Sequence, residues 1–345
     1  MDSIEIDGSY GEGGGQILRT SVALSAITKK SILVSNIRAK RDNPGLRPQH
    51  VSAIKVIASL CDADVEQVDV GSSMIRFSPK EMRSGSMKID VGTAGSITMI
   101  LQAVIPAVSI SGKRAEVELI GGTDTRLSPT FDYLRYVFHS AYKALGINFD
   151  LRVLRRGYYP VGGGVVKVTI EPCSKLKPLD MVNAPKVEPK MVSVCSMLPE
   201  HVAERQIASA LAKLQKADLK CNSYSASFEQ SMSPGSSILI YSISDYGPFI
   251  GGDSIGERGK RAELVGAEAA SKFLDAYLSN APIDPYLADM LILPLSLAEG
   301  KSRLMVNRVS QHLSTNLYVT SKFVDYKYEI SRSNGNHIVK IENKS

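Results

Sequence analysis

Five neighbouring residues near the start of the chain, Gly11 to Gly15, combine four glycines with one acid, Glu12. Glycines let backbone amides approach an anionic ligand closely, and a helix is expected behind them over residues 15–28, with Arg19 in its first turns. The carboxylate of Glu12 beside an anion suggests a bridging metal ion. The spacing matches neither the P-loop, because no lysine follows, nor the dinucleotide fingerprint. A simple tight turn therefore stays open as an alternative.

A second cluster of chemistry-bearing residues is basic. Arg38, Lys40, Arg41 and Arg47 fall within ten residues, around a turn-forming segment at residues 42–45. Arginine can bind two oxygens of one phosphate at once, so this loop predicts a phosphate clamp. A solvated basic surface would have the same composition, and that alternative also stays open.

Histidines are the candidate nucleophiles and bases. His139 lies in an apolar predicted helix and His337 in a polar segment, which favours structural roles, and His50 suits capping or backbone hydrogen bonding. His312 lies in the polar segment 309–316, expected as a short element between two strands. From spacing alone its role is either structural or catalytic. No Ser-His-Asp or Cys-His arrangement stands out.

The composition is that of a globular protein with a mild excess of positive charge. Hydrophobic residues make up 43% and charged residues 22% of the chain, which argues against disorder. A net charge of +6 slightly favours a polyanionic partner. The four cysteines are scattered without a Cys-x-x-Cys pair, which excludes a common zinc site; we expect them to be small buried hydrophobic residues. The longest apolar stretch, residues 97–110, contains Gln102 and Pro106 and is too short to span a bilayer, and we expect no secretory signal.

Strand and helix patterns alternate along the chain, as if similar α/β units were used repeatedly. A length of 345 residues predicts two domains, and the stretch from 174 to 190, rich in Lys, Pro and Asp, has the composition of a linker before a small inserted module. Helices are expected over residues 15–28 and 49–60, from 97 through 102, over 130–145, around 207–214 and over 261–278. Strands are expected over residues 4–6, 32–34, near 68, over 74–77, at 89, and over 115–120, 148–154, 165–170, 191–196 and 237–244.

Six segments of the chain together resemble the RNA 3'-terminal phosphate cyclases, in that family's order: residues 7–20, 36–50, 92–96, 121–124, 157–164 and 198–205. The resemblance implies an α/β (α+β) fold. Its large domain, residues 1–183 and 276–345, would consist of three repeated units of two helices on a four-stranded sheet. Each unit would be related to the C-terminal domain of translation initiation factor three. A small inserted α/β domain would occupy residues 184–275.

The resemblance also implies an enzyme that uses ATP to convert an RNA 3'-phosphate into a 2',3'-cyclic phosphate. The implied route passes through a covalent histidine–AMP and then an RNA-adenylate. His312 matches the family's nucleophile, and Glu12 matches its metal-contacting acid, which implies a divalent ion such as Mg or Mn. The residues that match positions holding the triphosphate or the RNA phosphate are Arg19, Arg38, Arg41 and Gln49. The residues that match positions around the adenosine are Gln102, Pro129, Tyr286 and Asp289.

Met290 departs from the family pattern, because relatives commonly have glutamine there. A thioether can pack on adenine but cannot donate a hydrogen bond, so selectivity for ATP is less secure than nucleotidyl transfer itself. The sequence leaves open the physiological RNA, the preferred metal, activity on DNA or 5' ends, and whether the protein forms a homodimer. Because no basic run suggests a nuclear signal, we expect a cytoplasmic protein.

Three other functions compete with this interpretation. Cyclase-like ribosomal RNA processing factors keep the fold but lack the nucleophile, so His312 argues against them and for the true cyclase branch. An enolpyruvyl-type transferase would use comparable repeats, but this rests on fold analogy and offers no role for His312. A plain RNA-binding module would bind in a salt-sensitive way, indifferent to the 3'-phosphate.

Overall fold

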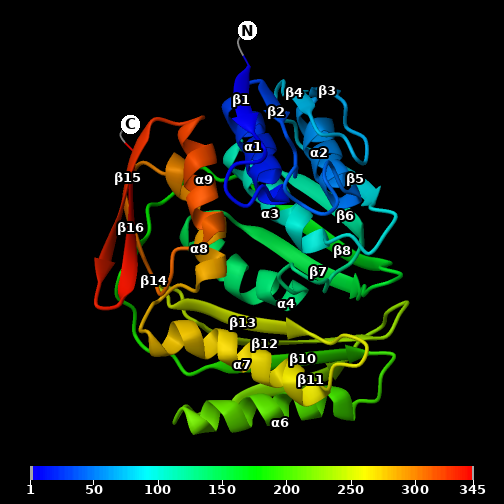
Figure 1. Cartoon of the computed structure of the whole chain (residues 1–345), viewed down its shortest axis with the longest axis vertical. Helices are drawn as coiled ribbons and strands as arrows, with labels where there is room; N and C mark the ends of the chain where they lie inside the picture. Colours follow the sequence, from blue (N-terminus) through cyan, green and yellow to red (C-terminus); the bar gives the residue numbers. More distant parts are fainter. Residues whose placement is uncertain (1–2, 344–345) are drawn as a thin grey trace.

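Four sheets of four strands each organise residues 3–343, the part of the chain that the computed structural model describes (Figure 1). Three of the sheets share one strand order, in which the second strand lies between the first, parallel to it, and the fourth, antiparallel to it, and the third strand pairs with the fourth at the edge. In each of these units one helix precedes the second parallel strand and another follows it. The predicted fold class, with three repeated α/β units and a small inserted α/β domain, is confirmed.

The first unit contains the glycine-rich segment and the basic loop. Its elements are β1 (Ile4–Asp7), α1 (Gly15–Thr28), β2 (Ile32–Ser35), α2 (Pro48–Cys61), β3 (Asp64–Glu66) and β4 (Ile75–Ser78). β1 runs parallel to β2, and β4 is antiparallel to both β2 and β3. The strand expected near Val68 is wrong: β3 ends two residues earlier, and Val68 packs half-buried against the core.

The second unit repeats this order. Its elements are β5 (Gly85–Asp90), α3 (Ile97–Ile110), β6 (Ala115–Gly121), α4 (Phe131–Tyr133), the π-helical turn η1 (Leu134–Phe138), α5 (His139–Ala144), β7 (Phe149–Arg155) and β8 (Gly164–Ile170). α3 continues past its expected end at Gln102, with Pro106 inside it. Residues 103–109 of α3 are all buried, so tertiary packing maintains the helix through a residue that would break it in isolation.

The third unit is interrupted by the insertion. Its first strand, β9 (Asp180–Met181), lies within the predicted linker and pairs in parallel with β14 (Gly300–Val306). The remaining elements are α8 (Pro285–Leu297), α9 (Gln311–Ser321), β15 (Tyr326–Ser333) and β16 (Asn336–Asn343). In Figure 1, α9 of this unit stands next to α1 of the first unit, so the first and third units pack against each other there.

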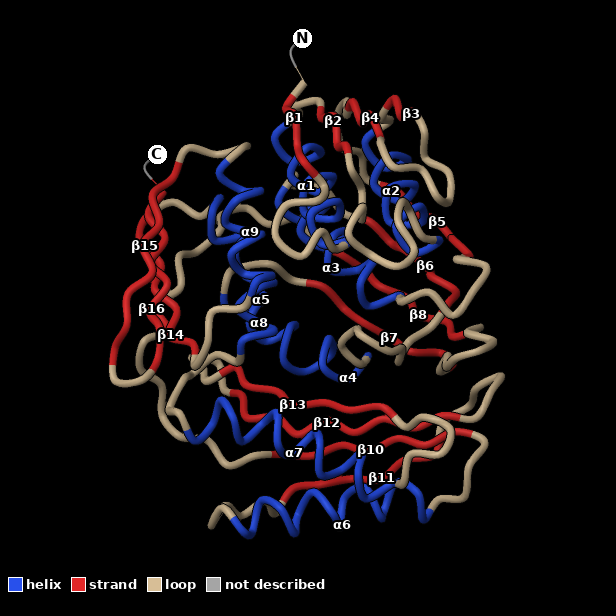
Figure 2. Tube along the Cα trace, in the orientation of Figure 1, coloured by secondary structure: helices blue, strands red, loops and turns tan. Residues whose placement is uncertain are grey.

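The inserted elements form the fourth sheet with two helices on one face. They are β10 (Lys190–Ser196), α6 (His201–Lys216), β11 (Ser223–Phe228), β12 (Gly235–Ile243), β13 (Phe249–Ile255) and α7 (Ala262–Leu278). Figure 2 shows α6 and α7 on one side of this sheet and α4 of the second unit on the other. Helices contact β12 on both faces, so nearly all of this strand is buried, whereas the edge strand β11 is exposed. The residue limits of the two domains stay a prediction.

Two hydrophobic cores account for the packing of the described residues. The larger core joins the three repeated units, and the smaller one lies between the inserted sheet and its helices. All four cysteines are buried and unpaired, as expected. No helix within residues 3–343 is long and apolar enough to cross a membrane.

Close contact between β13 and α7 yields a stability prediction. A Cβ atom at Gly252 would lie 2.3 Å from the backbone nitrogen of Phe273 and 2.4 Å from the carbonyl oxygen of Ala269. Because backbone atoms cannot move aside as a flexible side chain can, Gly252→Ala is expected to lower the free energy of unfolding by about 1–3 kcal/mol in chemical denaturation. Gly85→Ala is the matched control: it changes another strand glycine, one with open space around it. Equal stabilities of the two variants would contradict the prediction.

Candidate active site

The predicted nucleophile and the predicted metal-contacting acid lie beside each other. His312 is the second residue of α9, and its Nε2 lies 3.6 Å from Oε2 of Glu12. The same carboxylate oxygen accepts a hydrogen bond from Arg41 over 3.1 Å. A Cβ atom at Gly14 would lie 3.3 Å from the Arg41 guanidinium and 3.9 Å from the His312 ring, so glycine leaves room for both side chains.

The position of His312 follows from how α9 begins. Ser310 caps the helix, accepting a hydrogen bond from the backbone of Leu313 over 2.9 Å. The Ser310 hydroxyl also donates to Oδ1 of Asp289 on α8 over 2.5 Å. The helix that carries His312 is thus held at its first turn by the side chain of Asp289, a predicted adenosine-site residue.

Four of the predicted residues line one small cavity. Its volume is about 30 Å³, and it lies where α1, α3, α8 and α9 meet. Its lining residues are Gln16, Arg19, Thr20, Gln102, Ala103, Asp289, Met290, Leu293 and Asn316. The side-chain nitrogen of Gln102 is buried there without a hydrogen-bond partner among the described residues. An unpaired buried donor is costly, which makes the cavity suited to a ligand that supplies an acceptor.

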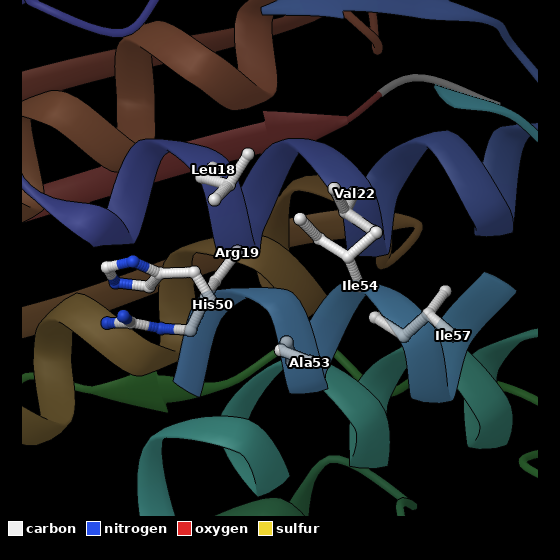
Figure 3. A pocket seen from close by; sticks show the side chains of 8 residues that line it. Leu18, Arg19, Val22, His50, Ala53, Ile54 and Ile57 are labelled. Carbon is white, nitrogen blue, oxygen red and sulfur yellow. The ribbon is translucent and has the colours of Figure 1, made fainter. Parts of the chain in front are cut away.

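Arg19 and His50 lie together where α1 packs on α2. Figure 3 shows the His50 ring and the Arg19 guanidinium at the same end of a second cavity between these helices. Within residues 3–343, no acceptor bonds the Arg19 guanidinium, and burial lowers its pKa to about 10, so it remains protonated at neutral pH. A Cβ atom at Gly15 would lie 2.1 Å from His50 Nε2. Glycine at this position therefore makes room for the imidazole.

His50 has the capping role that the sequence suggested. Its Nδ1 accepts a hydrogen bond from the backbone of Arg47 over 3.0 Å at the start of α2. Burial, followed by the charges of Arg19, Arg38 and Arg47, lowers the pKa of His50 to about 3. The imidazole is therefore neutral at neutral pH and leaves Nδ1 free to accept.

The basic loop presents a crowded group of arginines. Arg38 adopts a left-handed backbone conformation with φ of 54° and donates to the carbonyl oxygens of Asn43, over 2.6 Å, and Gly45, over 3.2 Å. Burial and then the charges of Arg47 and Arg41 lower the pKa of Arg38. Mutual repulsion among these cations would be relieved by a bound anion.

Like Glu12, His312 and the arginines of the basic loop, three more of the predicted residues do not line the cavity. Gln49 accepts a hydrogen bond from the backbone of Ser96 over 3.1 Å, and so joins the first unit to the second. The carbonyl oxygen of Pro129 accepts from Thr98 over 2.9 Å. Tyr286 is 43% exposed.

Tyr286 lies between two cations on other elements. Lys272 of α7 and Arg308, just before α9, each lie 5.8 Å from the centre of its ring. The aromatic ring is therefore in a positively charged surrounding at the edge of the site.

Asp289 is the most perturbed acid of the group. Burial raises its pKa to about 8, the hydrogen bond from Ser310 opposes the shift, and the charges of Asp284 and Glu12 raise it further. Around neutral pH this side chain is largely protonated. It can then donate a hydrogen bond as well as accept one.

Four residues that the sequence analysis missed connect the elements of the site. Asn316 Oδ1 accepts from Thr20 over 2.9 Å, and Asn316 Nδ2 donates to the carbonyl oxygen of Asp289 over 2.6 Å. Tyr10 stacks on Tyr318 with ring centres 3.8 Å apart and so attaches the glycine-rich loop to α9. No clear signal in the sequence marked Thr20 and Asn316, because α1 and α9 each contain several other polar residues.

Comparison with known proteins identifies the family. The family model for RNA 3'-terminal phosphate cyclase matches residues 10–330. The chain belongs to the RNA 3'-terminal phosphate cyclase family. The predicted family membership, and with it the assignment as an enzyme, is thereby confirmed.

Individual relatives agree over the full length of the chain. The RNA 3'-terminal phosphate cyclase of Methanococcoides burtonii is 46% identical, with 98% of this chain and 99% of the relative covered. That of Pyrobaculum aerophilum is 42% identical, with 99% and 98% covered. The enolpyruvyl transferase NikO of Streptomyces tendae aligns with this chain at a TM-score of 0.38 and 10% identity, over 49% of its own length. That likeness is too weak to support an argument about fold or function.

The buried imidazole of His50 yields a prediction on pH. The unfolded chain binds a proton at His50 below about pH 6.5, whereas the folded chain does so only near pH 3, so stability falls as the pH drops through this window. Between pH 7 and pH 5 the wild type is expected to lose about 2 kcal/mol more unfolding free energy than His50→Gln. Denaturant titrations at both pH values measure this loss of unfolding free energy. His201→Gln, which changes an exposed histidine, is the control. An equal loss in wild type and His50→Gln would contradict a neutral His50.

Proposed function

We propose that this protein converts the 3'-phosphate end of RNA into a 2',3'-cyclic phosphate at the expense of ATP, with AMP carried covalently on His312. One observation carries the proposal. The imidazole of His312 lies at the first turn of α9, 43% exposed, beside the carboxylate of Glu12, with Arg41 on the same carboxylate. This arrangement offers a reachable nucleophile next to groups that can neutralise phosphate charge.

The electrostatic surroundings of His312 suit a nucleophile. Burial is the main cause that lowers its pKa, Arg19 and Arg41 lower it further, and Glu12 opposes them. A neutral imidazole has a lone pair at pH 7. In the first step Nε2 bonds to the α-phosphorus of ATP while the bond to pyrophosphate breaks, with Arg19 and Arg41 balancing the triphosphate charge.

The later steps transfer the activated phosphate. An oxygen of the RNA 3'-phosphate attacks the phosphorus on His312 and the P–N bond breaks, which gives an RNA-adenylate and frees the imidazole. The neighbouring 2'-hydroxyl then attacks the 3'-phosphorus, loses its proton and expels AMP, which closes the cyclic phosphate. AMP is needed as the leaving group because a phosphate monoester could otherwise expel only oxide. Arg38, Arg41 and Gln49 are the proposed contacts of the RNA phosphate.

A divalent ion fits this arrangement only as a bridge to phosphate. No group of three or more His, Cys, Asp or Glu residues within 3–343 could hold a metal ion by itself. Mg²⁺ commonly binds through one or two carboxylates together with substrate phosphates and water. Glu12 would hold such an ion, which would supply further positive charge to the triphosphate.

The small cavity lined by Gln102, Asp289 and Met290 is proposed as one wall of the adenosine site, since its volume of about 30 Å³ admits only a water-sized group. Gln102 offers its unpaired side-chain nitrogen, Asp289 offers a proton donor or acceptor, and Met290 offers an apolar surface. Tyr286 would lie at the entrance, and Pro129, in the loop before α4, would lie where its carbonyl oxygen meets Thr98 of α3. A cytoplasmic location and the state of assembly stay predictions.

The covalent intermediate is the direct test of the mechanism. Wild-type protein incubated with α-labelled ATP and Mg²⁺ or Mn²⁺ is expected to acquire an acid-labile, alkali-stable label, since a phosphoramidate has these properties. His312→Ala is expected to acquire none. His337→Ala, which changes a histidine on β16 away from the site, should label like the wild type. Equal labelling of wild type and His312→Ala, or none in either, would rule out this mechanism.

Met290 provides a prediction on nucleotide choice. Met290→Gln adds a hydrogen-bonding amide to the cavity lined by Gln102 and Asp289. One such bond is worth about 0.5–1.5 kcal/mol, so the ratio of adenylylation rates with ATP and GTP is expected to rise by about 2- to 10-fold. Met290→Leu keeps the apolar character and should leave the ratio unchanged. A ratio that Met290→Gln fails to change would place the base away from residue 290.

A further inference from the structure

The turn between β7 and β8 carries an aromatic side chain that nothing in the fold covers. This segment, residues 157–164, contains four glycines. At its tip Tyr159 is 80% exposed and Val161 is 49% exposed. The proposed steps of catalysis give this segment no role, although it is one of the six motifs that the sequence shares with its family.

The base of the turn is unusually well anchored. Arg156 is fully buried and bonds three carboxylates: Asp124 over 3.2 Å, Asp132 over 2.8 Å and Glu229 over 2.8 Å. Asp124 and Asp132 belong to the second unit, whereas Glu229 lies between β11 and β12 of the insertion. Removing one member of a buried charge network is strongly destabilising. The second unit and the insertion, which both contribute carboxylates to Arg156, therefore both hold the turn in place.

The residues next to Arg156 add further constraints. The ring of Tyr158 is buried so tightly against Gly235 that a Cβ atom there would lie 2.0 Å from it. At Gly163 a Cβ atom would lie 2.5 Å from the sulfur of Met232, whose side chain is 52% exposed. The turn therefore presents an exposed tyrosine on a rigid support, with a second apolar side chain at its foot.

A chain of contacts leads from this turn to the proposed phosphate-binding residues. A Cβ atom at Gly162 would lie 2.8 Å from both the Cα atom of Ala94 and the carbonyl oxygen of Thr93, so the two loops touch through their backbones. A Cβ atom at Gly95 would lie 3.3 Å from Cβ of Gln49, and Gln49 accepts from the backbone of Ser96. Gln49 lies two residues after Arg47 of the basic loop.

The charge beside the turn favours a polyanion. Arg155 donates from Nε to the carbonyl oxygen of Gly163 over 2.7 Å. Among the described residues it forms no ion pair with any acid, so its positive charge is available to a ligand. Cations along a surface that also offers an aromatic ring are the recognition elements of single-stranded nucleic acid.

We propose that Tyr159 is a stacking platform for a nucleobase of the RNA, upstream of the nucleotide that carries the 3'-phosphate. This rests on the proposed function, because it takes the terminal phosphate to lie at Arg38, Arg41 and Gln49. The RNA then runs from these residues past the loop at 93–96 to Tyr159, with Arg155 beside its backbone. A rigid aromatic side chain loses little conformational entropy on binding, which suits a platform that accepts any base.

The experiment measures binding of 3'-phosphorylated RNA oligonucleotides by fluorescence anisotropy without ATP. Tyr159→Ala is expected to weaken binding by roughly 5- to 100-fold, the range for loss of one base–aromatic stack, and Tyr159→Phe to restore it. Tyr246→Ala is the matched control, because Tyr246 is 87% exposed on a turn of the insertion and should not contribute. A single abasic nucleotide is then placed at successive positions of the RNA. At one position it should weaken binding by the wild type but should not weaken binding by Tyr159→Ala any further.

Labelling with α-labelled ATP separates this proposal from the one it rests on. Tyr159→Ala is expected to form the histidine–AMP as the wild type does, since Tyr159 is not among the residues near His312. Normal RNA affinity in Tyr159→Ala, equal losses in Tyr159→Ala and Tyr246→Ala, or no position that responds to the abasic nucleotide would each overturn the platform. Absence of label in the wild type would overturn the proposed function instead.

Discussion

A buried chain of hydrogen bonds between the first and third repeat units holds the candidate active site together. Thr20 donates to Asn316, and Asn316 donates to the backbone of Asp289. All three residues are buried, and an unpaired polar group at such a depth costs about 1–3 kcal/mol. These hydrogen bonds therefore fix α1, α8 and α9 against one another. The relative positions of Arg19 and His312 depend on them.

Two histidines in this region show how one electrostatic environment supports different roles. His50 and His312 both have a lowered pKa, with burial as the main cause and nearby arginines adding to it. His50 is 3% exposed, and its lone pair accepts a backbone hydrogen bond. His312 has 43% of its side chain exposed, and its Nε2 faces Glu12. Access to solvent and the neighbouring Glu12 carboxylate distinguish the candidate nucleophile from the structural imidazole.

The insertion has its own hydrophobic core and still reaches the edge of the site. Asp275 on α7 accepts hydrogen bonds from Asn307 and Arg308, in the segment just before α9, and Lys272 lies over Tyr286. At its other end the insertion supplies Glu229 to the buried charges around Arg156. It therefore contacts the repeated units on both sides of the candidate active site.

The sequence by itself determined most of the elements and the family, because helical periodicity, strand alternation and long motifs are local properties of the chain. It placed the helix over residues 15–28 at its observed limits and anticipated the capping role of His50. It misplaced β3, ended α3 too early and treated β9 as linker. These segments are short or contain proline, and their structure depends on partners that are distant in the sequence.

Only the tertiary structure decided which side chains meet. Arg38 hydrogen-bonds carbonyl oxygens of its own loop, Arg19 lies by Gln102 and Asp289, and Pro129 lies outside the cavity. Glu12 reaches His312 because helices from opposite ends of the chain pack together. Such neighbours are set by burial and hydrogen bonding between whole units, and no local pattern of residues specifies them.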